Sequence, residues 1–333
     1  MFIINSYALA VFFCIITMLC WGSWANTAKV STEKWPFPMF YWDYSLGLIL
    51  MTLIYGLTMG STGENGRSFI ADLQQADSSS FTSAFIGGVV FNLSNLLIVA
   101  AIAVAGISVA FPIGVGLALV IGVIVNYIKN PAGDPVLLFG GVLLVVVAIV
   151  VNAIASSKVS ISKGSTPVKG IVLSVMAGII MGFFYRFVAD GMTLNFVSPD
   201  PGKMTPYSAV LIFSLGVFIS NFLWNTFFMY KPVEGSKSTY KNYFTNGTSI
   251  QHLFGLIGGM IWLTGFLFNL IASDKAGPAI SYGLGQGATM IGAAWGVFVF
   301  KEFKGAPASI NKYLVTMFVT FIAGLALIII ARL

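Results

Sequence analysis

Charged residues are scarce in this sequence of 333 residues, because Asp, Glu, Lys and Arg together make up only 8% of it. Soluble domains have about a quarter of their residues charged, so this chain lacks the polar surface that a water-soluble protein needs. The net charge of +6 comes from basic residues that stand singly, without the clusters that bind nucleic acid. These features exclude a soluble protein and a nucleic-acid partner.

Cysteine and histidine are also rare, with two cysteines and one histidine. Cys14 and Cys20 lie on different faces of one apolar run, which excludes a disulfide framework and a metal-binding pair. His252 starts another apolar run, and we interpret it as an interface residue. The sequence has no phosphate-binding loop, metal motif or nucleophile motif, which excludes an enzyme and ATP-driven transport. We expect no cofactor, and any coupling would use an ion gradient, with protons as the first candidate.

Apolar residues are abundant, at 57% of the chain with a mean hydropathy of +0.92. A helix needs about 20 apolar residues to cross the hydrocarbon of a bilayer, and ten stretches meet this requirement. The first stretch lacks the preceding basic residues of a signal peptide, so we interpret it as a membrane helix. The expected fold class is an all-α polytopic membrane protein. Its predicted spans cover about residues 5–27, 39–60, 82–104, 107–128, 135–156, 168–190, 206–230, 250–272, 278–300 and 311–331.

The two halves of the chain match in glycine placement. Residues 87–116 align with 258–287 at an offset of 171, and five glycines coincide. Because each half has five spans, the second half must enter the membrane from the opposite side, which makes an inverted repeat. We predict a first repeat at 1–157, a short cytoplasmic linker at 158–167 and a second repeat at 168–333. The alternative is a membrane scaffold with an incidental duplication.

Basic residues are unevenly divided between the two sides of this arrangement. Loops after the odd-numbered spans hold 11 basic residues, against five on the other side. Basic loops stay in the cytoplasm, so we predict that both termini lie outside. The 11 residues are Lys29, Lys34, Lys158, Lys163, Lys169, Lys231, Lys237, Lys241, Lys301, Lys304 and Lys312; the five are Arg67, Lys129, Lys203, Lys275 and Arg332.

Two glycine-rich runs occupy matching positions in the halves. The run 111–126 contains Pro112, and its counterpart 277–296 contains Pro278. Proline removes a backbone donor and frees a carbonyl, so we predict two interrupted helices near a binding region. Plain flexible packing is the alternative interpretation.

Amide and aromatic side chains recur within the predicted spans. A buried amide without a partner costs about 1–3 kcal/mol, so these groups bond to one another across helices or to a ligand. Together with aromatic rings, they describe a pocket for a small neutral solute with many hydrogen-bonding groups. The candidate substrate-binding residues are Trp21, Trp24, Asn26, Asn92, Asn95, Asn221, Asn225, Trp262, Asn269, Tyr282 and Gln286.

Ionisable residues inside spans are costly and are therefore functional candidates. Asp43 lies early in the second span, and we predict that it accepts a proton; the alternative is an interfacial acid. Arg186 and Asp190 lie four positions apart in the sixth span and can pair. These three residues are the candidates for proton coupling.

Three segments resemble the ureide permease family: "LCWGSWAN" (19–26), "FYWDYSLGLIL" (40–50) and residues 87–127. That family belongs to the drug/metabolite transporter superfamily of ten-helix carriers, with bacterial glucose/ribose and rhamnose–proton porters. The resemblance implies import of small neutral metabolites, either ureides and nucleobase-like compounds or monosaccharides. It also implies that this import is coupled to protons. The pattern is kept at Trp21, Gly22, Trp24, Asp43, Tyr44 and Asn95. Plant members have a long hydrophilic insert where this chain has the short link 157–170, so it looks like a protein of a bacterial inner membrane.

We therefore predict a secondary transporter that imports a small neutral polar metabolite by alternating access, embedded in a lipid bilayer. One alternative is a passive facilitator or channel for the same solutes, in which Asp43 is structural. Another is a drug or metabolite exporter, which would favour a more apolar and acidic cavity.

Overall fold

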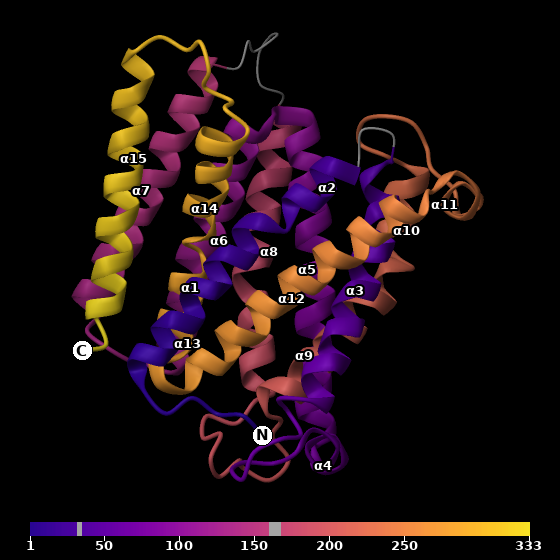
Figure 1. The fold of residues 1–333 in the computed structure, drawn as a ribbon, viewed down its shortest axis with the longest axis vertical. Coiled ribbons are helices and arrows are strands. Elements are labelled where there is room, and N and C mark those ends of the chain that lie inside the picture. The colour runs from indigo at the N-terminus through magenta and orange to yellow at the C-terminus, as the bar shows by residue number, and fades with distance from the viewer. Residues whose placement is uncertain (32–34, 160–167) are drawn as a thin grey trace.

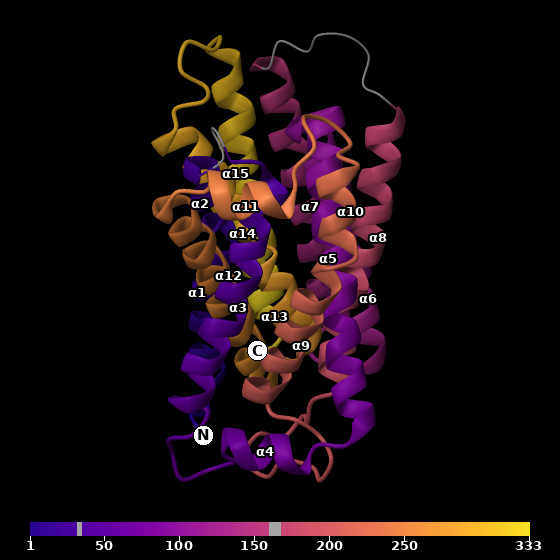
Figure 2. The same ribbon diagram turned by 90° about the vertical axis from the view of Figure 1, so that its right-hand side faces the viewer.

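The computed structural model describes residues 1–31, 35–159 and 168–333, which form a bundle of helices (Figures 1 and 2). Outside the helices, one isolated β-bridge joins Met192 to Met204. The helices are α1 (Tyr7–Ser23), α2 (Ala25–Ser31), α3 (Phe37–Leu57), α4 (Phe69–Gln75), α5 (Ser78–Ala105), α6 (Ile107–Lys129), α7 (Pro135–Val159), α8 (Val168–Asp190), α9 (Pro206–Asn221), α10 (Trp224–Tyr230), α11 (Tyr240–Asn246), α12 (Ser249–Ala276), α13 (Pro278–Gly285), α14 (Ala288–Ala294), the π-helical turn η1 (Trp295–Val299) and α15 (Ser309–Ile330).

Nine helical segments within the described residues are long and apolar enough to cross a membrane, and they correspond to nine of the ten predicted spans. The remaining predicted span, 278–300, is divided into α13, α14 and η1, and none of these pieces is long enough alone. Hydropathy therefore located the apolar segments well, but it did not reveal how they are divided.

Both termini lie at one end of the bundle, which we call the terminal face (Figure 1). The Met1 amino group donates to the Asn65 carbonyl at 2.8 Å, and the Asp134 N–H donates to the Ala331 carbonyl at 2.7 Å. The other end, the opposite face, carries α2, α11 and the segment 300–308. Which face lies outside the membrane stays a prediction, and the predicted linker falls outside the described residues except for Lys158 and Val159.

Glycines allow the long helices to approach one another closely. A Cβ at Gly88 in α5 would lie 2.1 Å from the Phe213 carbonyl oxygen in α9, and one at Gly259 in α12 would lie 2.0 Å from the Tyr44 carbonyl oxygen in α3. Small residues are needed here because only backbone-to-backbone approach gives such tight helix packing in lipid. Gly88 and Gly259 are separated by the offset of 171 found in the sequence.

Replacing Gly259 with valine should separate α3 from α12. Because backbone atoms cannot be displaced cheaply, we expect the apparent melting temperature in detergent to fall by about 5 °C or more. The matched control is Gly116→Val in α6, where an added Cβ meets nothing within 4 Å among the described residues. Equal melting temperatures for the two variants would contradict this assignment of the contact.

One prediction about interrupted helices is wrong. The run 111–126 lies inside α6, which is continuous from Ile107 to Lys129 although it contains Pro112. Pro112 is only the sixth residue of the helix, so it removes one backbone hydrogen bond next to the first turn, whose N–H groups have no acceptor within the helix in any case. The counterpart 277–296 is interrupted, at residues 286 and 287 between α13 and α14.

Candidate functional site

A cavity of about 500 Å³ lies within the bundle. This volume is typical of pockets that hold small molecules. Its lining comes from α1, α2, α3, α5, α6 and α7 of the first predicted repeat and from α8, α12, α14 and η1 of the second. Around it α8 packs against α5 and α6, and α1 packs against α12 and α14, so both predicted repeats contribute to each side.

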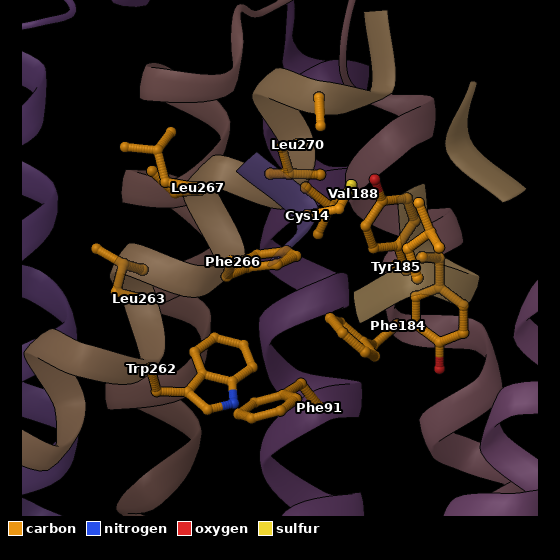
Figure 3. Packing of buried hydrophobic residues seen from close by; sticks show 14 of the residues in the cluster. Cys14, Phe91, Phe184, Tyr185, Val188, Trp262, Leu263, Phe266, Leu267 and Leu270 are labelled. Atoms are coloured by element: carbon orange, nitrogen blue, oxygen red, sulfur yellow. The ribbon is translucent and has the colours of Figure 1, made fainter. Parts of the chain in front are cut away.

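The cavity occupies the half of the bundle next to the opposite face. Along α5 its lining extends from Phe91 to Ile102 and along α6 from Ile107 to Ala118, in each case in the part of the helix nearer to that face, whereas along α8 it lies near mid-helix, from Ala177 to Phe184. Toward the terminal face, Phe91, Phe184 and Trp262 form a floor that continues into packed aromatic residues (Figure 3). In this conformation the cavity is closed toward the termini.

A charged pair lies at the rim of the cavity. The Lys29 ammonium is 3.1 Å from the Glu302 carboxylate, and both side chains are about half exposed. The same ammonium lies 3.7 Å from the centre of the Phe300 ring. Because the two rim charges compensate each other, the cavity suits an uncharged solute.

Indole rings provide flat surfaces in the wall. Trp21 is stacked on Trp262 with 5.7 Å between ring centroids, and its Nε1 donates to the Trp262 carbonyl at 3.2 Å. Trp24 lies 4.9 Å from the ring of Tyr44, and the Trp295 Nε1 donates to the Ser23 hydroxyl at 2.8 Å. These contacts hold the rings in place without a ligand, and rigid rings of this kind can stack on a planar solute.

Amide and hydroxyl groups lie among these rings. The buried Asn26 Nδ2 has no hydrogen-bond partner in the described part of the chain, and Asn95 Nδ2 donates to the Tyr41 hydroxyl at 3.1 Å. Gln286 lies in the break between α13 and α14, where helical hydrogen bonding is interrupted. The Asn26 amide is therefore the clearest donor available to a ligand.

The predicted substrate-binding residues fall into two groups. Those in the cavity wall are Trp21, Trp24, Asn26, Asn95, Trp262 and Gln286. The others, which lie buried between helices and outside the wall, are Asn92, Asn221, Asn225, Asn269 and Tyr282. Of the second group, Asn269 donates to the Ser281 carbonyl and Tyr282 to the Ala118 carbonyl, so both act as contacts between segments.

Several polar or aromatic wall residues were not among the predicted candidates, and they include Ser94, Asn152, Thr289 and Trp295. Asn152 and Trp295 had the expected chemistry, but they lie near the ends of their spans and gave no distinguishing signal. Ser94 and Thr289 are short hydroxyl residues of a kind that occurs on most faces of these helices. Their positions depend on helix rotation, which the sequence alone does not provide.

Asp43 lies outside the cavity wall, in a polar cluster that joins α3 to α11 and α12. Its side chain is 4% exposed, and both carboxylate oxygens lie within 3.0 Å of His252 Nδ1. The Tyr243 hydroxyl donates to the same carboxylate at 2.5 Å. When the carboxylate is ionised it only accepts, so His252 Nδ1 is then the donor in this contact. The interpretation of His252 as an isolated interface residue missed this pairing.

Tyr243 is held as a donor by its surroundings. Burial raises the pKa of its hydroxyl, and the hydrogen bond to Asp43 and that carboxylate's charge raise the pKa further. The hydroxyl therefore stays protonated throughout the physiological pH range. The His252 ring is 28% exposed, so the cluster has one face toward water.

Arg186 and Asp190 form an ion pair at 2.9 Å within α8, with side chains 18% and 36% exposed. Neither residue lines the cavity. Metal chemistry has no support in residues 1–31, 35–159 and 168–333, where no group of three His, Cys, Asp or Glu side chains is placed to hold an ion.

Known proteins resemble this chain over nearly its full length. The sequence profile named Ureide permease matches residues 40–165 and 156–331. Ureide permease 1 of Arabidopsis thaliana is 24% identical over 98% of this chain and 98% of its own length, and Ureide permease 2 of the same plant is 23% identical with the same coverage.

The alignment with Ureide permease 1 spans 387 positions, more than the 333 residues of this chain, so that relative has residues that this chain lacks. A solved crystal structure of a protein superimposes with a TM-score of 0.60 at 14% identity, covering 98% of this chain and 99% of that one. At this identity the superposition shows a shared fold and nothing about activity.

Proposed function

The chain belongs to the ureide permease family, and from that premise we propose that it carries a small, neutral, planar and hydrogen-bonding solute by alternating access. Its relatives are permeases, so the protein is a multi-pass membrane transporter and not an enzyme. The observation that carries the proposal is the 500 Å³ cavity with rigid indole rings and an unpartnered Asn26 amide among the described residues.

We propose a ureide or nucleobase-like solute before a monosaccharide. Stacked rings such as Trp21 and Trp262 favour a flat ligand, whereas hydroxyl pairs of a sugar would call for several amides in bidentate positions. The names of the plant relatives point the same way. Among the described residues the wall has one acidic side chain, Glu302, and its pairing with Lys29 at the rim leaves no net charge for a cationic drug.

The proposed mechanism rests on two halves that are related by an inverted repeat of five segments each, as in the drug/metabolite transporter superfamily. A Cβ added at Gly216 would lie 2.3 Å from the Phe85 carbonyl oxygen, and one added at Gly47 would lie 2.2 Å from the Leu256 carbonyl oxygen. Phe85 and Leu256 are 171 residues apart (256 − 85), the same offset that relates Gly106 and Gly277. Gly106 and Gly277 each form a one-residue turn, with φ of 77° and 84°. This exchange of equivalent contacts supports rocking of one half against the other around the cavity.

We propose coupling to protons through Asp43, with His252 as its partner. The carboxylate is buried in a span, and the partly exposed imidazole connects it to water on the opposite face. A buried carboxylate in such a position is suited to take up and release a proton as access changes. By the positive-inside rule the opposite face is cytoplasmic, so this conformation is open inward in a bacterial inner membrane.

Binding and uptake measurements test the proposal directly. We expect allantoin or uracil to raise the melting temperature of the purified protein, and ribose and glucose to have smaller effects. Uptake of the same solute into proteoliposomes should rise when the lumen is made more alkaline than the medium. A response to ribose alone would replace the planar solute with a sugar, and uptake indifferent to the pH gradient would favour a passive facilitator.

The proposal also predicts that Asn26→Ala weakens binding of the solute. Loss of one hydrogen bond to an uncharged ligand costs about 0.5–1.5 kcal/mol, so the Kd for the solute should rise by about 2- to 12-fold. The control is Asn246→Ala in the surface helix α11, which should bind as the unchanged protein does. Unchanged affinity in Asn26→Ala would remove this amide from the site.

A further inference from the structure

Three buried asparagines gather where α9 meets α5 and α3. Asn92 of α5, Asn221 of α9 and Asn225 of α10 are each 0% exposed, and none lines the large cavity. In the part of the chain that the structure describes, Asn92 Oδ1, Asn225 Oδ1 and both side-chain polar atoms of Asn221 have no hydrogen-bond partner. Each such atom costs about 1–3 kcal/mol if it stays unsatisfied, so the cluster calls for a ligand.

Two of these amides have a defined orientation. Asn92 Nδ2 donates to the Val217 carbonyl at 3.1 Å and to the Ser220 hydroxyl at 2.7 Å. Asn225 Nδ2 donates to the Pro38 carbonyl at 2.8 Å. Because a carbonyl can only accept, the nitrogen of Asn225 must face Pro38 and its oxygen must face away. The unsatisfied atoms at Asn92 and Asn225 are therefore oxygens.

The cluster surrounds a break in a membrane-spanning segment. The segment Pro206–Tyr230 is interrupted at residues 222 and 223, between α9 and α10. There the N–H groups of Phe222 and Leu223 donate to the carbonyls of Ile219 and Ser220, three residues back, which ends α9 as a tight turn. The C-terminal end of a helix has a partial negative charge, and such half-helix ends coordinate cations in transporters.

We propose that this junction binds a monovalent cation, with Na⁺ as the probe, through the amide oxygens of Asn92, Asn221 and Asn225. Oxygens are the ligands that alkali and alkaline-earth ions prefer, and the lack of a carboxylate among these three residues favours a single positive charge over two. A water molecule donates only two hydrogen bonds, whereas three acceptor oxygens are present. A cation can be coordinated by all three oxygens, with the Asn221 Nδ2 donor on the far side of its amide left without a partner among the described residues.

The junction is placed to link ion binding to the movement of the halves. Asn92 lies in the first predicted repeat, and its partners Val217 and Ser220 lie in the second. The neighbouring Asn95 of the cavity wall bonds to Tyr41 in α3, close to Pro38, the partner of Asn225. A bound cation would therefore favour the arrangement seen here. This inference rests on different atoms from the proposed solute site.

The test compares thermal unfolding of the purified protein in NaCl, KCl and choline chloride at equal ionic strength. We expect a saturable rise in melting temperature with Na⁺ that choline does not produce, and saturable binding of ²²Na⁺ to the unchanged protein. Equal melting temperatures in the three salts, with no ²²Na⁺ binding, would overturn the proposal and leave water as the occupant. Failure of allantoin or uracil to bind would affect only the solute proposal.

Asn221 is a suitable position for a substitution, because its side chain has no hydrogen-bond partner among the described residues and its removal breaks no such bond. Asn221→Ala should fold, keep its stability in choline chloride, and lose the Na⁺-dependent rise in melting temperature. Asn221→Asp should bind Na⁺ at least tenfold more tightly, because it adds a negative charge to the cluster. Asn246→Ala is the control and should keep the response. A full Na⁺ response in Asn221→Ala would overturn the proposal for this residue.

Discussion

Trp262→Ala is expected to weaken solute binding by about 5- to 160-fold, since stacking of a planar base on an aromatic side chain contributes about 1–3 kcal/mol. The indole lines the cavity and is stacked on Trp21. It also packs against Phe91, with 4.4 Å between ring centroids. The variant therefore removes a stacking surface and also releases the rings that hold the floor in place. Isothermal titration with the solute identified in the screen measures the change.

The control must separate binding from stability, because removing a buried tryptophan costs about 3–5 kcal/mol wherever it lies. Trp42 has nearly the same burial, 6% against 5% exposed, and its Nε1 donates to the Met229 sulfur at 3.3 Å, away from the cavity. Trp42→Ala should lose comparable stability and keep its solute affinity. Similar affinities in the two variants would exclude Trp262 from the site.

The sequence predicted the positions of the apolar segments because crossing a membrane imposes a length and a hydropathy that any single segment satisfies by itself. The glycines that coincide between the two halves include Gly106 and Gly277, and both form turns with the positive φ that glycine readily adopts. The break between α9 and α10 was not predictable in the same way. Residues 222–224 are Phe, Leu and Trp, and none of them marks a helix end.

Assignment of polar residues to a cavity or to a helix contact depends on partners far away in the sequence. Asn26 and Asn92 have the same side chain in the same kind of apolar surroundings, yet one lines the cavity and the other bonds to Ser220. Asp43 and His252 are 209 positions apart, so nothing local joined them. Tertiary packing decides these cases, and a one-dimensional pattern does not contain it.

Packing of the two faces accounts for the direction in which the cavity opens. At the terminal face, Arg67 donates to the Asp72 carboxylate at 2.9 Å and to the Lys203 carbonyl at 3.1 Å, which fastens the segment 61–77 to the segment 191–205. At the opposite face, Lys29 and Glu302 bridge the rim at its surface, where exposed ion pairs contribute about 0–1 kcal/mol. The conformation seen here is thus closed by a strong network at one end and weakly bridged at the other.

Asp43→Asn is expected to abolish uphill accumulation of the solute while leaving solute exchange intact. Asparagine has nearly the same shape and still accepts from the Tyr243 hydroxyl, but it cannot take up a proton. With one proton per solute, a gradient of one pH unit corresponds to about 1.36 kcal/mol and so drives up to about tenfold accumulation by the unchanged protein. The variant should reach only equal concentrations on the two sides. Proteoliposomes with an imposed pH gradient measure the accumulation ratio, and counterflow of labelled solute measures exchange.

Asp190→Asn is the matched control for Asp43→Asn. Asp190 also lies in a span, but it pairs with Arg186 on its own helix, and its side chain is 36% exposed. An exposed pair of this kind has little effect on a proton equilibrium, so this variant should accumulate solute as the unchanged protein does. Accumulation lost in Asp190→Asn and kept in Asp43→Asn would move the proton site to α8. Accumulation kept in both variants under the pH gradient would remove both carboxylates from the coupling step and place the proton site elsewhere in the chain.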